Sequence, residues 1–541
     1  MKNQLSLSAL LISEAIFSGI SAKPNVDKTT KLQVRPNILF CIADDASYPH
    51  FSANGSHWIK TPSFDRVARE GILFSNCYTP NAKSGPSRSC VLTGLYSWQA
   101  REAGNHVTNF PADLKVVTEA LAENGYDIAF TGKGWAPGNP GITPDGKPRQ
   151  LTGKAFMKEK LTPPTMGISP INYASNFSDF LNENNGKKPW FFWFGSHEPH
   201  RSYEFGTGEK IGLKTKGMID DFPLFWPDND DVRTDMLDYG YEIEYFDKQI
   251  QKMMSELEKR GLLENTIIVI TSDNGMPFPR SKANDYEYSN HMPLAIMWKN
   301  GIIKPGRKII DFVNFVDFTP TFLDVSKTNP KKFGMQQPSG KSLRNIFFSE
   351  KNGLVDSSRN YLLLGRERDD YGRPDNQGYP IRAIIRDNFI YINNMKPNLY
   401  PAGDPETGYL DCDGSPTKTV ILNMKREGKD TKFWDFSFGF RKSEELYNLA
   451  NDKFCMNNLA EKPEYAKQKQ AMKKQLFEQL KKQKDPRMFG KGDVFDKYPF
   501  DENENWNFYE KVIRGEIKEP WKITKWVNPS DYDTYYYQNK K

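Results

Sequence analysis

The chain has 541 residues, a length typical of about two to four domains or of one large core with a smaller partner. It is 38% hydrophobic and 26% charged, with a mean hydropathy of −0.69, which excludes a polytopic membrane protein and argues against wholesale disorder. The 74 Lys and Arg residues against 68 Asp and Glu leave a net charge of +6. Spread over this length, that charge does not indicate a nucleic-acid partner.

The N-terminus has the pattern of an export signal. Lys2 precedes an apolar run from Leu5 to Ile20, and the small residues Ser21 and Ala22 follow it. We therefore predict a signal peptide over residues 1–22 and a mature protein that is periplasmic or secreted. The run is too short to span a bilayer comfortably, so no membrane span is expected. A cytosolic N-terminal segment is the alternative, because Glu14 interrupts the run.

Short apolar, β-rich runs alternate with helical segments through the first two-thirds of the chain. This alternation is typical of an α/β domain with a mostly parallel central sheet. Strands are predicted at residues 37–43, 127–130, 190–194, 266–271 and 294–298, and helices at residues 62–70, 116–124, 235–260 and 317–325.

Beyond residue 343 the pattern changes. Strands at residues 361–365 and 381–393 predict a smaller sheet, and residues 463–484 predict a helix with one apolar face. The tail from Pro499 is so aromatic that we expect it to pack on the main body. We therefore divide the mature chain into a catalytic domain, residues 23–345, and a C-terminal subdomain with an aromatic-rich tail, residues 346–541.

Polar residues follow four of the predicted strands. Because ligands bind beyond the carboxyl ends of strands in such sheets, these residues are candidates for a site. Any one group could instead form a turn or cap a helix, but four together predict a site. The groups are Asp44-Asp45, residues 131–133, residues 195–200 and residues 272–275.

The most specific motif begins at Ser84, with Pro86, Arg88 and the pair Thr93-Gly94 in fixed spacing. It resembles the sulfatase signature, in which a Cys or Ser before x-Pro-x-Arg is oxidised to Cα-formylglycine. The resemblance implies an alkaline-phosphatase-like fold, with a mixed sheet sandwiched by helices and a smaller C-terminal α+β subdomain. It also implies one divalent cation, usually Ca²⁺, formylglycine (3-oxoalanine) at position 84, and an anaerobic sulfatase-maturating enzyme as a partner for this Ser-type motif.

The resemblance also implies roles for the polar groups. A sulfate ester is an anion, so a hard cation held by oxygen ligands and fixed positive side chains are needed to offset its charge. Each residue has a structural alternative: a helix cap, a surface ion pair, a turn or a core histidine. The implied metal ligands are Asp44, Asp45, Ser84, Asp273 and Asn274, and the implied catalytic residues are Ser84, Arg88, Lys133, His197 and Lys282.

Several segments resemble the sulfamidase subfamily, the N-sulfoglucosamine sulfohydrolases. They are residues 195–201, 272–284, 317–324 and 379–382. We therefore assign His106, His200, Asn284 and Arg382 to substrate binding, with a structural hydrogen bond as the alternative for His200. One departure is clear: many relatives carry a His two residues after the motif lysine, and Trp135 stands there. Which residue replaces that His is open, and His106 is one candidate.

The sequence thus predicts an exported sulfatase that acts on sulfated glycans, with N-sulfoglucosamine of heparin or heparan sulfate as the favoured substrate. The alternatives are a glycosaminoglycan O-sulfatase, a phosphodiesterase-like hydrolase of the same superfamily, and a non-catalytic glycan-binding protein in which Ser84 is never modified. The five cysteines predict no disulfide scaffold; Cys412 and Cys455 could pair, but buried free thiols are favoured. His50, His57 and His291 lack a motif and are expected to be structural.

Overall fold

The computed structural model describes residues 35–143 and 145–540. The predicted signal peptide lies outside these residues. These described residues form one compact unit. In the described part of the chain, no helix has both the length and the hydrophobicity that crossing a membrane requires.

A nine-stranded mixed sheet forms the centre of the protein, as predicted. Its order is β10-β2-β9-β8-β1-β7-β4-β6, with β11 paired to β2. Strand β9 runs antiparallel to both β8 and β2, and the other pairs are parallel. The strands are β1 Asn37–Ala43, β2 Ile72–Tyr78, β4 Asp127–Gly132, β6 Lys154–Ala155, β7 Trp190–Gly195, β8 Thr266–Ser272, β9 His291–Met297, β10 Arg307–Ile309 and β11 Val313–Asn314.

Strand β1 explains why the sequence of the central strands is continuously apolar. It lies between β7 and β8, and every one of its residues is buried. Ile38, Phe40 and Ile42 join the core on one face of the sheet, whereas Leu39 and Cys41 join the core on the other. A strand that is buried on both faces needs apolar side chains at both positions of its two-residue repeat.

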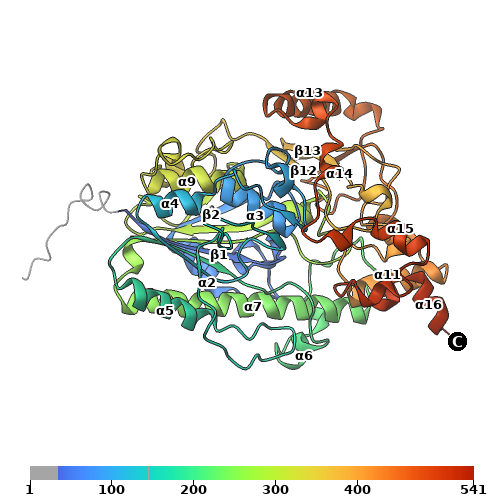
Figure 1. Cartoon of the computed structure of the whole chain (residues 1–541), viewed down its shortest axis with the longest axis horizontal. Helices are drawn as coiled ribbons and strands as arrows, with labels where there is room; N and C mark the ends of the chain where they lie inside the picture. Colours follow the sequence, from blue (N-terminus) through green and yellow to red (C-terminus); the bar gives the residue numbers. More distant parts are fainter. Residues whose placement is uncertain (1–34, 144, 541) are drawn as a thin grey trace, which may run out of the picture. The chain divides into compact units, whose positions relative to one another are not determined.

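Helices cover both faces of the sheet (Figure 1). One face carries α3 Ser84–Thr93, α4 Val117–Glu123 and α9 Phe318–Val325; the other carries α2 Pro62–Glu70, α5 Tyr173–Asn184 and α7 Asp230–Lys259. The predicted helices are all present. Helix α7 begins five residues before the predicted start, because the Asn229 side chain caps it by accepting a hydrogen bond from the backbone N–H of Val232.

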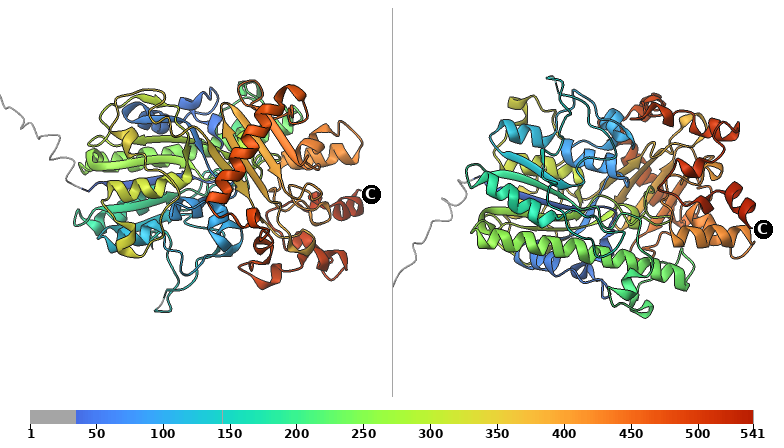
Figure 2. Two further views of the ribbon diagram at one scale, coloured as in Figure 1. Left: turned by 90° about the horizontal axis from the view of Figure 1, so that it is seen from above. Right: turned by 60° about the horizontal axis from the view of Figure 1, so that its bottom comes forward.

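The second, smaller sheet is antiparallel, with strands in the order β12-β13-β14-β15. They are β12 Leu362–Arg366, β13 Ile381–Arg386, β14 Phe389–Asn394 and β15 Glu444–Asn448. The single strand predicted at residues 381–393 is wrong: Asp387 and Asn388 adopt φ of 50° and 61° and form a two-residue turn that makes it a hairpin. Helix α13 Ala466–Lys482 lies across this sheet and buries Met472, Leu476 and Leu480 (Figure 2).

The remaining elements are short. A two-stranded parallel pair, β3 Thr108–Asn109 and β5 Gly138–Asn139, ties two loops together next to the site described below. The other helices are α6 Thr207–Lys210, α8 Glu287–Asn290, α10 Arg344–Phe347, α11 Pro416–Arg426, α12 Lys432–Ser437, α14 Val494–Lys497, α15 Phe508–Ile513 and α16 Asp533–Asn539.

The aromatic tail packs on the main body over much of its length, as predicted. Phe500, Phe508 and Tyr532 are buried in one cluster with Tyr371 of the smaller subdomain, whereas Tyr537 is exposed. All five cysteines lie in the described part of the chain, and each is a buried free thiol, so the alternative of a Cys412–Cys455 disulfide is wrong. The division at residue 345 stays a prediction, although all strands of the smaller sheet lie beyond it.

Candidate active site

The polar residues that follow the strands do come together at one edge of the sheet. In the parallel pairing, Ile42 lies opposite Gly195, Ala43 opposite Ser272, and Gly132 opposite Gly195. The strands β1, β4, β7 and β8 therefore end level with one another. The residues that follow them, Asp44-Asp45, Lys133, His197 and Asp273-Asn274, start from neighbouring backbone positions.

Two glycines allow the strand ends to approach this closely. Gly132 has φ +77°, and a Cβ there would lie 1.9 Å from the carbonyl oxygen of Gly195. A Cβ on Gly195 would lie 1.8 Å from the carbonyl oxygen of Lys133. Because neither position has room for a side chain, the glycine before Lys133 is a requirement of the backbone that sets where this lysine emerges.

Three buried carboxylates form the candidate metal centre. One oxygen from each of Asp44, Asp45 and Asp273 lies within 4.8 Å of the others. Asn274 adds an amide oxygen, Oδ1, which lies 3.3 Å from Oγ of Ser84. Carboxylate and amide oxygens are the ligands of a hard cation, so the donor set fits Ca²⁺ better than zinc.

Asp45 is held in an unusual conformation at this centre. Its φ of +75° lies in the left-handed region, which aspartate tolerates better than most residues. Its backbone N–H donates to Asp273 Oδ1 at 3.0 Å, and Asn274 Nδ2 donates to Asp45 Oδ1 at 2.6 Å. These contacts fix the strained residue and aim its carboxylate into the centre.

Fixed positive charges surround the carboxylates. Lys133 Nζ donates to both oxygens of Asp44 at 2.8 and 2.7 Å and to Ser84 Oγ at 3.3 Å. Arg88 is fully buried; its Nε donates to Asp273 at 2.9 Å and its second nitrogen contacts Asp44 at 3.4 Å. Burial by itself would raise the pKa of Asp44, but Lys133 and Arg88 outweigh it and hold this pKa well below its usual range.

Ser84 is the first residue of α3, whose ten residues are all buried. Its Oγ lies 3.2 Å from Asp44 Oδ1, 3.3 Å from Asn274 Oδ1 and 3.3 Å from Lys133 Nζ. The N-terminal end of a helix carries a partial positive charge and favours an anion. The predicted modified residue therefore lies between the candidate metal ligands and a lysine, at a helix end suited to sulfate.

Next to the candidate metal centre, a lysine ammonium lies within a second group of possible metal ligands. Asp45, His200 and Asp413 offer ligand atoms within 4.8 Å of one another. Lys282 Nζ contacts all three, at 2.7 Å from Asp45, 3.1 Å from His200 Nε2 and 2.9 Å from Asp413. The ammonium group thus occupies the position that a second metal ion would need. Sequence reasoning missed Asp413, whose partner is 131 residues away.

The contacts of His200 define its tautomer. Nδ1 lies 2.8 Å from the carbonyl oxygen of Arg201, which can only accept, so Nδ1 carries a proton. Nε2 then accepts from Lys282 in a neutral ring. His200 thus makes a structural hydrogen bond and also lines the cavity described next, and its role in substrate binding stays a prediction.

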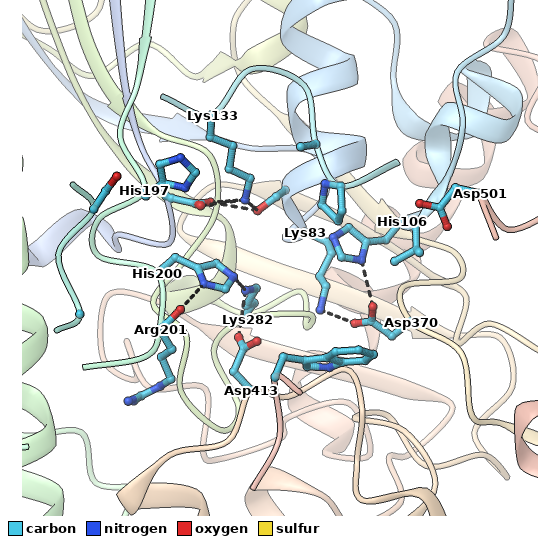
Figure 3. A pocket seen from close by; sticks show the side chains of 18 of the residues that line it. Lys83, His106, Lys133, His197, His200, Arg201, Lys282, Asp370, Asp413 and Asp501 are labelled. Atoms are coloured by element: carbon cyan, nitrogen blue, oxygen red, sulfur yellow. Dashed lines mark hydrogen bonds and ion pairs between the residues drawn. The ribbon is translucent and has the colours of Figure 1, made fainter. Parts of the chain in front are cut away.

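A cavity of about 760 Å³ opens onto these residues (Figure 3). Ser84, Asp44, Lys133 and Lys282 line it, and His197 is exposed within it. Desolvation by the surrounding cavity walls, partly opposed by Asp44 and reinforced by Lys133 and Arg88, lowers the pKa of His197 to about 4. Other lining residues come from distant parts of the chain: Lys83, His106, Met166, Arg201, Asp370, Tyr371, Asp413, Asp501, Glu502, Asn505 and Trp526.

Two predicted substrate-binding residues lie elsewhere. Arg382 is fully buried and makes ion pairs with Glu367 at 2.6 Å and Asp485 at 2.7 Å, so it holds the smaller subdomain together and does not line the cavity. Asn284 is also buried, donates to the carbonyl oxygen of Lys282 at 3.1 Å and does not line the cavity. Its side chain therefore supports the loop of Lys282 and does not contact the cavity directly.

The histidines without a motif have structural contacts. His50 is buried against Tyr239, with Nδ1 at 3.0 Å from its hydroxyl, and His291 stacks on Tyr48. His57 is exposed and does not line the cavity. These positions agree with the expectation that none of the three takes part in the site.

Ser84 at a helix end, a candidate centre for a hard cation, and fixed lysine and arginine charges thus lie together on an alkaline-phosphatase-like fold, an arrangement suited to the hydrolysis of an anionic ester. The sulfatase family model matches residues 36–328. The chain belongs to the sulfatase family, and it is a hydrolase of sulfate esters or sulfamates.

Curated relatives agree with this family. An ulvan-active sulfatase from Formosa agariphila is 26% identical over 484 residues, covering 83% of this chain and 76% of the relative. N-sulphoglucosamine sulphohydrolase from Homo sapiens is 27% identical over 479 residues, covering 82% of this chain and 90% of the relative. The chain therefore resembles both a sulfamidase and ulvan-active enzymes along most of its length.

Solved structures show the same fold. One was solved in complex with its substrate D-glucosamine-2-N,6-O-disulfate; it is 22% identical, with a TM-score of 0.57, and the match covers 84% of this chain and 99% of that one. Another, a 2-O GAG sulfatase, is 18% identical, with a TM-score of 0.58 and coverage of 84% and 94%.

Proposed function

We propose that the protein is an exported sulfatase that releases sulfate from sulfated glycans by means of formylglycine at position 84 and one Ca²⁺ ion. Its favoured substrate is N-sulfoglucosamine of heparin or heparan sulfate. One observation carries the proposal: Ser84 Oγ lies within 3.3 Å of Asp44, Asn274 and Lys133 at the N-terminal end of α3.

The metal would be held by Asp44, Asp45, Asp273 and Asn274, with residue 84 completing the ligands. Such a cation polarises the sulfate oxygens and offsets their charge. The protein itself supplies the other positive charges. Arg88, anchored by the carbonyl oxygens of Lys133 and Gly134 at 2.8 Å each, lies 2.9 Å from Asp273 and 3.4 Å from Asp44 and so helps to orient both carboxylates toward the centre.

Residue 84 would supply the nucleophile. An unmodified serine hydroxyl is a weak nucleophile without an adjacent base. The hydrated aldehyde of formylglycine supplies two hydroxyls on one carbon: one attacks sulfur, and the other later reforms the aldehyde as sulfate leaves. Lys133 Nζ, 3.3 Å from Ser84 Oγ, is positioned to stabilise the charge that develops at residue 84 and on the sulfate.

The leaving group needs a proton, and the sequence offers two donors, Lys282 and His197. The contacts of these two side chains favour His197. All three N–H groups of Lys282 have acceptors, and Asp413 and Asp45 overcome burial to raise its pKa, which makes Lys282 a weak acid. His197 is exposed in the cavity, and a bound anionic sulfate would favour its protonated form. We therefore assign the general acid role to His197, and to Lys282 the role of holding Asp45 and His200.

The cavity lining supports a sugar as the leaving group. Tyr371 and Trp526 supply aromatic surface, and Asp501, Glu502 and Asn505 supply acceptors for hydroxyl groups. Asp501 and Glu502 would repel a second sulfate placed beside them. These features favour a sugar that presents hydroxyls to this side of the cavity. The two curated relatives named above, a sulfamidase and an ulvan-active enzyme, support a glycan substrate.

The test uses two glucosamine disaccharides, one that carries only N-sulfate and one that carries only 6-O-sulfate. Sulfate release is followed by ion chromatography after co-expression with an anaerobic maturase. The proposal predicts release from the N-sulfated disaccharide. Release from the 6-O-sulfated disaccharide alone would replace the sulfamidase assignment by an O-sulfatase assignment, and release from neither would contradict the proposed substrate.

A further inference from the structure

We propose that His106, oriented by Asp370, is the base that takes a proton from a hydroxyl of residue 84 as sulfate leaves. The inference rests on the proposed function and adds a catalytic residue to it. His106 lies in a different loop from the motif lysine, Lys133. Its partner Asp370 lies 264 residues further along the chain.

Strands β3 and β5 bring His106 beside the loop of the motif lysine. Thr108 pairs with Gly138 and Asn109 with Asn139 in parallel register. His106 precedes Thr108 by two residues, and Ala136 precedes Gly138 by two residues. The short strand pair therefore brings His106 close to the loop that carries Trp135, the position at which the family resemblance implies a histidine.

His106 also lies against the residue that follows Ser84. A Cβ on Gly85 would lie 3.4 Å from Cδ2 of His106 and 3.5 Å from the carbonyl oxygen of Pro137. Gly85 is thus enclosed by the loops of His106 and Pro137. Both His106 and Ser84 line the same cavity.

The Nε2 atom of the His106 ring is available to accept a proton. Nδ1 lies 3.1 Å from Asp370 Oδ1, which can only accept when ionised, so Nδ1 carries the proton and Nε2 carries the lone pair. Among the described residues Nε2 has no hydrogen-bond partner, and it is not a buried unpartnered atom, so it is open to the cavity. Figure 3 shows the His106 ring joined to Asp370, on the opposite side of the view from His197 and His200.

Asp370 is itself held in place. Its second oxygen lies 2.7 Å from Nζ of Lys83, the residue directly before Ser84. Its backbone N–H donates to Asp411 at 3.0 Å, and the backbone N–H of His106 donates to the carbonyl oxygen of Arg368 at 3.0 Å. Lys83 and Asp370 are therefore positioning residues, which fix the tautomer and the direction of the His106 ring.

Trp135 cannot act as this base. Its indole nitrogen carries a proton and has no basic lone pair. That N–H already donates to Ser89 Oγ at 2.8 Å and to the carbonyl oxygen of Gly85 at 3.0 Å. Trp135 therefore supports the backbone beside Ser84, and the proton-accepting role is open to His106.

The step conserves atoms and charge. His106 Nε2 takes the proton of the free hydroxyl on residue 84, and the electron pair of that O–H bond forms the carbonyl bond of the aldehyde. The bond between the residue-84 carbon and the sulfate oxygen breaks, and its electrons leave with sulfate. The protonated ring is stabilised by Asp370 and returns the proton to water.

The experiment compares the parent enzyme with His106→Gln and His106→Ala, using sulfate release together with the mass of the peptide that carries residue 84. We expect sulfate release to fall by about 10²–10⁴-fold, the usual contribution of one general base. During turnover this peptide should gain the mass of one SO₃ group relative to its hydrated form, because attack still proceeds while release of sulfate is slow. Asp370→Asn should show the same gain in mass and a changed pH profile.

The matched control is His57→Gln, an exposed histidine outside the cavity, which should match the parent. Parent-like release by both His106 variants, or slow release without the gain in mass, would overturn the role of His106. Loss of folding in His106→Ala would leave His106→Gln, which keeps size and polarity, to decide. A parent enzyme whose residue 84 stays serine and which releases no sulfate would instead contradict the proposed function.

Discussion

Replacing Lys133 by Met tests the electrostatic part of the site. The side chain has 11% of its surface exposed, and its Nζ lies 2.7 and 2.8 Å from the oxygens of Asp44 and 3.3 Å from Ser84 Oγ. Met keeps the length of the side chain and removes its charge and donors. The backbone should stay in place, because the carbonyl oxygen of Lys133 accepts from Arg88 at 2.8 Å and from Trp193 Nε1 at 3.0 Å.

The expected loss comes from one preorganised charge beside the reacting atoms. Removing one such donor typically lowers kcat by about 10²–10³-fold, or roughly 3–4 kcal/mol of transition-state stabilisation. The cost in fold stability should be smaller than the 3–5 kcal/mol typical of breaking a buried pair. Asp44 keeps Arg88 at 3.4 Å and would still bind the cation.

Sulfate release at saturating Ca²⁺ measures this effect, with circular dichroism as the check on folding. Lys154→Met is the matched control, since Lys154 is 60% exposed and forms an ion pair with Glu183 on the surface. Such surface pairs contribute at most about 1 kcal/mol. A folded Lys133→Met enzyme with the kcat of the parent would refute the role of Lys133 at residue 84.

Three further predictions concern the metal, the leaving group and acid stability. Asp273→Ala should abolish Ca²⁺ binding measured by calorimetry, and restoration of EDTA-treated enzyme by Zn²⁺ but not by Ca²⁺ would contradict the ligand assignment. His197→Ala should slow N-desulfation by about 10²–10⁴-fold but affect an activated aryl sulfate less, because its phenolate leaves without a proton; equal losses would count against His197 as the acid. Burial, slightly opposed by Asp221, lowers the pKa of His50 to about 3, so the unfolded chain binds this proton more readily. The free energy of unfolding should therefore fall as the pH drops from about 6.5 toward 3, by at most about 5 kcal/mol from this residue, and urea titrations of His50→Gln should lose that part of the slope.

The central sheet and its site could be predicted because their signals are local. Strand β1 is apolar along its whole length and ends in Asp44-Asp45, and β8 ends in Asp273-Asn274 in the same way. Parallel register then brings the strand ends level without further information. Strand β2 was missed because Ser75 and Asn76 interrupt its apolar pattern near the irregularity between Phe74 and Cys77.

The rest of the site depends on contacts between residues far apart in the sequence, which no local sequence pattern reveals. Asp413 meets Lys282 across 131 residues, and Asp370 meets His106 across 264. Asp and Lys are so common on surfaces that neither stands out without its partner. The position of Arg382 could not be foreseen for a related reason: the resemblance locates its strand but not the burial of the side chain between Glu367 and Asp485.

The most direct measurement is the mass of the peptide that carries residue 84, taken together with sulfate release by the same preparation. We expect co-expression with an anaerobic maturase to convert Ser84 to formylglycine and activity to rise with the converted fraction. Ser84→Ala should be folded and inactive. Full activity from protein that carries only intact Ser84 would contradict the proposed formylglycine nucleophile.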